Sequence, residues 1–152
     1  LARQTDRVLL VFGIASLAGI AVVGALVDHW LRALTLASIM LFGVAAAVLG
    51  MGAGTPPLVY GAVALWGLAF GGAATLFQTA SAKAAGAAAD LAQSMLVTVW
   101  NTAIAGGGLL GGLLLESAGV DAFAPALLLL LAAAFGVTLA STRGFPRRRS
   151  RR

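Results

Sequence analysis

Three amide side chains within otherwise apolar sequence are the residues of this chain best suited to bind a polar group. Gln78, Gln93 and Asn101 each lie inside or at the edge of a long apolar stretch. A polar side chain within an apolar span is costly unless it finds a partner. Each amide is therefore expected either to hydrogen-bond a neighbouring helix or to face a polar solute on a water-filled path. The two interpretations stand side by side for every one of them.

The ionisable residues do not form a catalytic set. The acidic residues all lie at breaks between apolar stretches or at their edges, and none is placed to work with a base: Asp6, Asp28, Asp90, Glu116 and Asp121. His29 is the one histidine, and a single imidazole does not make a metal site. The chain has no cysteine, which excludes disulfides and thiolate chemistry. We therefore predict no enzyme activity, no metal and no cofactor.

Aromatic side chains beside one of the amides form a second candidate surface. Trp66, Phe70 and Phe77 recur at positions i, i+4 and i+11, so they share one face of a helix, with Gln78 on the adjacent face. Aromatic rings next to an amide and small residues are suited to line a cavity for an amphipathic solute. Contact with lipid is the alternative interpretation of the same face.

The elements that position these residues are five apolar stretches that fill almost the whole chain. A helix needs about 20 apolar residues to cross the hydrocarbon core of a bilayer. Hydrophobic residues make up 61% of the 152 residues and charged residues 10%, whereas a water-soluble domain carries about 25% charge. We predict an all-α, polytopic membrane helix bundle over residues 1–142, with five transmembrane helices at about 8–27, 33–51, 58–80, 91–115 and 123–141. The alternative is a buried helical bundle inside a larger soluble assembly.

The distribution of Lys and Arg predicts the orientation. With five spans the termini lie on opposite sides, and a cytoplasmic C-terminus places eight basic residues inside and two outside. Most of the eight lie in the tail at residues 143–152, but Arg32 and Lys83 independently favour the same orientation. The tail either binds nucleic acid or anionic lipid electrostatically, or serves as a cytoplasmic topology anchor, and we favour the anchor. We therefore expect a multi-pass protein of the cell inner (plasma) membrane that binds no nucleic acid.

Small residues are abundant in the predicted spans. The chain has 20 glycines, and small residues let helix backbones approach closely in lipid. Three pairs have the G-x-x-x-G spacing, one in the third span and two that overlap in the fourth: Gly67 with Gly71, Gly107 with Gly111, and Gly108 with Gly112. We predict that these six glycines are helix-packing positions.

The first break between spans resembles a known loop motif. It reads G-A-L-V-D-H-W-L-R from Gly24 to Arg32 and is similar to the G-x-x-x-D-R-x-G-R-R loop of the major facilitator superfamily. Gly24, Asp28 and Arg32 match the motif, whereas His29, Leu31 and Ala33 depart from it. Independently of the family, a carboxylate at Asp28 just before a helix start is favoured by free N–H groups and the helix dipole. Arg32, four residues on, is placed to pair with it or with a lipid phosphate.

The third and fourth spans extend the resemblance. LWGLAFGG at residues 65–72 followed by Gln78, and Asn101 followed by GGGLLGGLLLE at residues 106–116, resemble helices 10 and 11 of the drug-proton antiporter and sugar-efflux (arabinose efflux permease-like) branch. Ala103 stands where that branch often has glycine, and the proline that the branch often has near Phe77 is absent. The resemblance implies that the spans are helices 8 to 12 of a twelve-helix fold. Helix 7 and the N-terminal half would then be missing.

The resemblance also implies an activity. It implies proton-coupled efflux of a small organic solute, either a drug-like compound or a sugar, by alternating access between two halves. The partners would be the lipid bilayer, the small-molecule substrate, protons and the missing N-terminal half. Trp66, Phe70, Gln78 and Asn101 would lie on the substrate pathway or a helix interface, while Asp28 and Arg32 would latch the cytoplasmic side.

A different class of function fits some of the same features. The chain does not begin with Met, and no charged residue lies in the middle of a span, although ion coupling usually requires one. The first of these features suggests a fragment or processed piece. Both also fit the alternative, a non-transporting small membrane protein that is a truncated remnant or an assembly partner.

Overall fold

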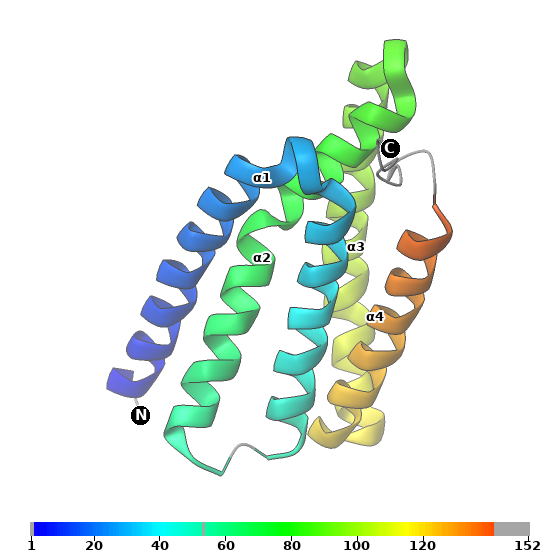
Figure 1. Ribbon diagram of the computed structural model, residues 1–152. Coiled ribbons are helices and arrows are strands. Elements are labelled where there is room, and N and C mark those ends of the chain that lie inside the picture. Colours follow the sequence, from blue (N-terminus) through cyan, green and yellow to red (C-terminus); the bar gives the residue numbers. More distant parts are fainter. Residues whose placement is uncertain (1, 53, 142–152) are drawn as a thin grey trace.

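The computed structural model describes residues 2–52 and 54–141, and within these ranges every regular element is a helix. The prediction of an all-α chain is confirmed. Four α-helices and two short 3-10 helices follow one another along the chain (Figure 1): α1 (Ala2–Gly50), α2 (Pro56–Ala85), η1 (Gly86–Ala88), α3 (Ala89–Ala118), η2 (Val120–Ala122) and α4 (Phe123–Ala140). The predicted basic tail at residues 143–152 lies outside the described residues.

Helix α1 is 49 residues long but is not straight. Trp30 has a non-helical backbone (φ −127°, ψ 21°), and the helix reverses its direction there. In Figure 1 the first half (residues 2–29) and the second half (residues 31–50) run in opposite directions on either side of α2. The sequence predicted a polar break over residues 28–32. In the structure this break is a single residue, because the backbone is helical at Asp28 and His29 before Trp30 and at Leu31 and Arg32 after it.

Proline and glycine define the ends of the next two helices. Helix α2 begins with Pro56 and Pro57, which suit the first turn because the N–H groups there have no partner within the helix. It ends at Gly86, whose φ of 55° is a conformation that favours glycine. Gly119 ends α3 in the same way, with a φ of 74° and an N–H that donates to the Leu115 carbonyl.

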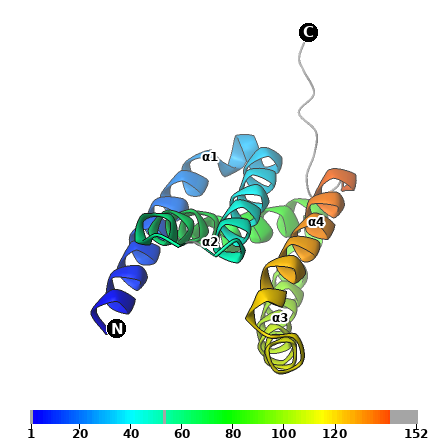
Figure 2. The same ribbon diagram turned by 90° about the horizontal axis from the view of Figure 1, so that it is seen from below.

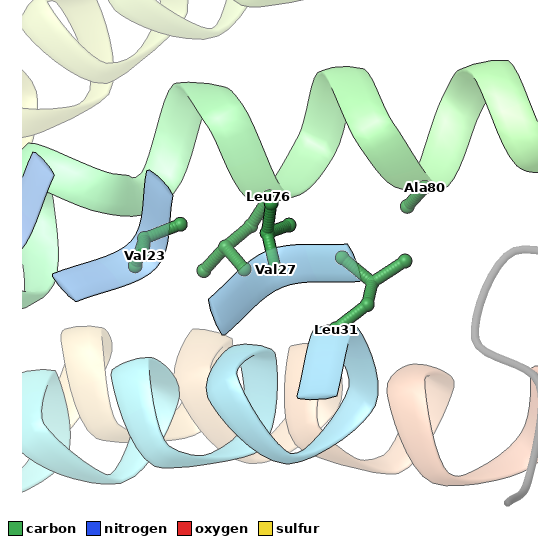
Figure 3. Close-up of a cluster of buried hydrophobic side chains, with 5 residues drawn as sticks. All are labelled: Val23, Val27, Leu31, Leu76 and Ala80. Atoms are coloured by element: carbon green, nitrogen blue, oxygen red, sulfur yellow. The ribbon is translucent and has the colours of Figure 1, made fainter. Parts of the chain in front are cut away.

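The apolar core lies between α1 and α2. Figure 3 shows Leu76 and Ala80 of α2 directed toward side chains of α1, and five buried residues form this cluster: Val23, Val27, Leu31, Leu76 and Ala80. The core includes the bend of α1, since Leu31 follows Trp30. Packing against α2 thus holds the two halves of α1 in their hairpin.

Helices α3 and α4 lie to one side of this pair. Seen from below in Figure 2, α3 and α4 stand beside each other and apart from the first half of α1. None of the 30 residues of α3 is buried. Three helical stretches of the described chain are long and apolar enough to cross a membrane: Thr5–Gly50, Pro56–Ala118 and Val120–Ala140.

Candidate functional site

The three residues that match the loop motif lie around the bend of α1. Gly24 and Asp28 are exposed, and no atom lies within 4 Å of the position that a Cβ at Gly24 would take. Asp28 lies within the helix, two residues before Trp30. Arg32 is half-buried, and its guanidinium donates hydrogen bonds to the backbone carbonyls of Leu139 and Ser141. One contact of Arg32 is therefore with the end of α4.

The aromatic residues predicted to share a face divide into two groups. Trp66 and Phe70 both contact Phe12 of α1, with ring centroids 6.4 and 5.8 Å from its ring. Phe77, about two turns beyond Phe70 and three beyond Trp66 on α2, instead contacts Trp100 of α3 at 6.0 Å. All three α2 side chains are more than 40% exposed. The first group joins α2 to α1, and the second joins α2 to α3.

The three amides also separate by role. The Gln93 side chain donates from Nε2 to the backbone carbonyl of Gln78 at 2.9 Å, which links α3 to α2. Asn101 donates from Nδ2 to the Val97 carbonyl of its own helix at 3.0 Å and is exposed. Gln93 thus links two helices, whereas Asn101 bonds within α3 and is exposed on its surface.

The glycine pair of α2 lies in a close interface with α1. A Cβ at Gly71 would overlap the backbone carbonyl oxygen of Ser16, and a Cβ at Gly67 would lie 2.5 Å from the carbonyl oxygen of Phe12. The neighbouring Gly72 and, from α1, Gly19 are equally confined. These positions admit no side chain, which agrees with the packing role expected of Gly67 and Gly71.

The glycine pairs of α3 lie in open space. No atom of the described chain lies within 4 Å of a Cβ built at Gly107, Gly108 or Gly112. Gly111 has only ordinary van der Waals contact, with Phe123 Cε1 at 3.7 Å. A packing role for these four glycines stays a prediction, and it requires a partner other than the described helices.

Small and polar side chains of α3 follow one another along a single face. They recur at intervals of three or four residues and are all exposed, and we call this set the α3 polar stripe: Ser94, Thr98, Asn101, Ala105, Gly108 and Gly112. Asp90 and Glu116 continue the same spacing at its two ends. Gln93 and Trp100, which contact α2, directly precede Ser94 and Asn101 and so lie about 100° round the helix from the stripe.

The polar members of the stripe bond back to their own helix. The Ser94 hydroxyl donates to the Leu91 carbonyl at 2.8 Å, and the Thr98 hydroxyl donates to the Ser94 carbonyl at 3.1 Å. Together with the Asn101 bond described above, each of these three side chains donates a hydrogen bond to a backbone carbonyl of α3. These side chains are exposed, and a hydroxyl or amide oxygen can also accept, so the stripe is suited to accept hydrogen bonds from water or from a solute.

The sequence interpretation identified Asn101, Gly108 and Gly112 but missed Ser94 and Thr98. The signal was available, since the spacing of three and four residues places all of them on one helix face. What the sequence did not give was the direction of that face relative to the other helices.

Comparisons of the chain with protein-family models, with curated proteins and with solved structures gave no match. The function is therefore argued from the residues and their geometry.

Proposed function

We propose that this chain is the C-terminal part of a major facilitator exporter that moves a small organic solute outward in exchange for protons by alternating access. The observation that carries the proposal is the uncovered α3 polar stripe. A helix that faces lipid on all sides is expected to be bulky and apolar, whereas this face of α3 is small and polar over about five helical turns. Such a face is suited to a water-filled path or to a moving helix interface.

The lengths of the apolar stretches support five membrane crossings. The stretch Thr5–Gly50 has 46 residues, which is about 69 Å of helix and about twice the hydrocarbon thickness of a bilayer. The bend at Trp30 divides it into two spans of suitable length. Gly86 divides the 63-residue stretch Pro56–Ala118 in the same way, and α4 supplies the fifth span.

The charges support the proposed orientation. Arg32 follows the bend of α1 and Lys83 lies in the last turn of α2. In Figure 1 the bend and the end of α2 lie toward the same side of the molecule as the C-terminal end of α4. Glu116 lies near the opposite end of α3. Basic residues are enriched on the cytoplasmic side of membrane proteins. We therefore propose that the C-terminal ends of α2 and α4 face the cytoplasm and that the protein lies in the plasma membrane.

Within this proposal Asn101 and the hydroxyls of the stripe bind the polar part of the solute. Trp66 and Phe70 pack against Phe12 in the first half of α1, so we assign them to a helix interface rather than to this part of the path. Gln78 belongs to the interface between α2 and α3 through its carbonyl. Asp28 keeps the proposed latch role on the cytoplasmic side, where it is exposed.

Proton coupling needs an ionisable group that changes its charge during the cycle. The spans of this chain carry no such group at their centres. We propose that the coupling residue lies in the N-terminal half of the transporter.

Accumulation of a solute panel in cells tests this function. Cells that express the complete reading frame containing this chain are compared with empty cells, using drug-like compounds and sugars, with and without a protonophore. We expect lower accumulation of at least one solute, and we expect the protonophore to abolish the difference. Unchanged accumulation across the panel, with the protein verified in the membrane, would favour the non-transporting alternative.

A further inference from the structure

The C-terminal end of α4 has an unusual partner. The last four carbonyls of a helix have no N–H partner within it. The guanidinium of Arg32 supplies two donors at this end: Nη2 lies 2.7 Å from the Leu139 carbonyl oxygen, and Nη1 lies 3.1 Å from that of Ser141. The residues are more than 100 positions apart in the chain. The side chain therefore joins the bend of α1 to the end of the last helix.

The length of α4 makes this contact consequential in a bilayer. Its 18 residues span about 27 Å, slightly less than the hydrocarbon core. Its last carbonyls then lie at the edge of the hydrocarbon, where water is scarce and an unpaired carbonyl is costly. A guanidinium also places positive charge at the negative end of the helix dipole.

The opposite end of α4 is fixed by a different contact. A Cβ built at Gly50, the last residue of α1, would overlap the Cβ of Ala124 in the first turn of α4. The second half of α1 and α4 are thus joined at both ends, by close backbone approach at one and by Arg32 at the other.

We propose that Arg32 is a positioning residue that fixes the C-terminal end of α4 against the bend of α1 and sets where this helix leaves the bilayer. The inference does not depend on any solute, and it rests only on the membrane location of the chain. Arginine suits the role better than lysine because its planar fork reaches two carbonyls at once.

Labelling of a single cysteine tests this role in open membrane fragments. The 152 residues contain no cysteine, so Ser141→Cys introduces one reporter at the end of α4 while keeping the backbone carbonyl that Arg32 binds. Any cysteine elsewhere in the complete protein is replaced by serine. The reagent is a water-soluble maleimide. Val120→Cys, in an otherwise identical protein, reports on the other end of α4, where the side chain is exposed; Ser141 is half-buried.

We expect Arg32→Gln to raise the labelling rate at position 141 about tenfold, since the loss of two charge-assisted hydrogen bonds lets the helix end open. The rate at position 120 should not change. Arg32→Lys should give an intermediate rate at position 141, because one ammonium replaces the fork. Lys83→Gln, which removes a basic residue from the exposed end of α2, should change neither rate.

Two outcomes would overturn the proposal. One is an unchanged rate at position 141 in Arg32→Gln. The other is an equal rise at positions 141 and 120, which would mean that the substitution loosens the whole bundle rather than one helix end. Both readouts are independent of solute accumulation, so they stand whether or not the exporter proposal survives.

Discussion

Glycines with the same spacing occur in the interface between α1 and α2 and on the outward face of α3, but their surroundings differ. In the interface, Gly67 and Gly71 meet the backbone of α1 so closely that a methyl group has no room. On α3, Gly108 and Gly112 have the same spacing and no neighbour within 4 Å of a Cβ. A G-x-x-x-G pair therefore indicates that close approach is possible, and only the surrounding helices decide whether the approach is made within the chain.

The largest expected effect separates these two surfaces directly. Gly71→Leu places a side chain against the Ser16 carbonyl, where backbone rather than a flexible side chain must shift. We expect a loss of about 3 kcal/mol in the free energy of unfolding. Gly108→Leu, the matched control in open space, should change it by less than about 0.5 kcal/mol. Titration with a denaturing detergent, followed by helix content, measures both. Equal losses in the two variants would contradict the comparison.

The next largest effect is expected at Asn101, on transport and not on stability. The described hydrogen bond of the Asn101 side chain stays within α3. Asn101→Ala should therefore leave the unfolding free energy nearly unchanged. If the α3 polar stripe binds solute, the same variant should reduce efflux about tenfold, as expected for the loss of one or two buried hydrogen bonds to a ligand. Accumulation assays at matched membrane levels measure it. Full efflux by the variant would remove Asn101 from the solute path.

A smaller effect is expected at the second half of α1. The Ser38 hydroxyl donates to the Ala69 carbonyl of α2 at 3.0 Å, and it is one of the few side-chain bonds between these helices. Hydrogen bonds between membrane helices contribute about 0.6 kcal/mol on average. Ser38→Ala should therefore lower the unfolding free energy by about that amount. A loss as large as that of Gly71→Leu would mean that polar contacts, and not close packing, dominate this interface.

The smallest effect has the opposite sign. The Ser16 hydroxyl oxygen is buried and has no hydrogen-bond partner in the described structure. Because an unsatisfied buried hydroxyl is costly, Ser16→Ala should raise the unfolding free energy by up to about 1 kcal/mol. The same titration detects it. A destabilised Ser16→Ala protein would reveal a bond that the hydroxyl makes in the membrane.

The helical class was predictable because long apolar runs leave the backbone no other way to satisfy its hydrogen bonds in lipid. The five predicted stretches fall almost entirely within helices, and α4 ends at Ala140 where residue 141 was predicted. The bend was placed correctly but expected to be longer, since polar residues at 28–32 are compatible with both a loop and a helix end. The number of spans that cross a membrane remains a prediction.

The tertiary contacts were beyond the sequence. Spacing alone predicted pairing for three glycine pairs, but spacing does not name the partner helix. The bond from Arg32 to the end of α4 was likewise invisible, because it joins residues more than 100 positions apart through backbone atoms that every residue carries. The candidate residues could therefore be identified from the sequence. Whether each of them lies in a packed interface or on an open face could be seen only in the fold.

Water access to the α3 polar stripe tests the central claim most directly. Single cysteines at Thr98 and Gly108, on the stripe, are compared with cysteines at Leu110 and Leu130, which are exposed bulky positions outside it. All are placed in the complete protein in intact membranes and treated with a small water-soluble thiol reagent. We predict labelling at the stripe about tenfold faster than at the two leucine positions, because the reactive thiolate forms only where water reaches it. Labelling at the stripe as slow as at Leu130 would contradict a solute path along α3.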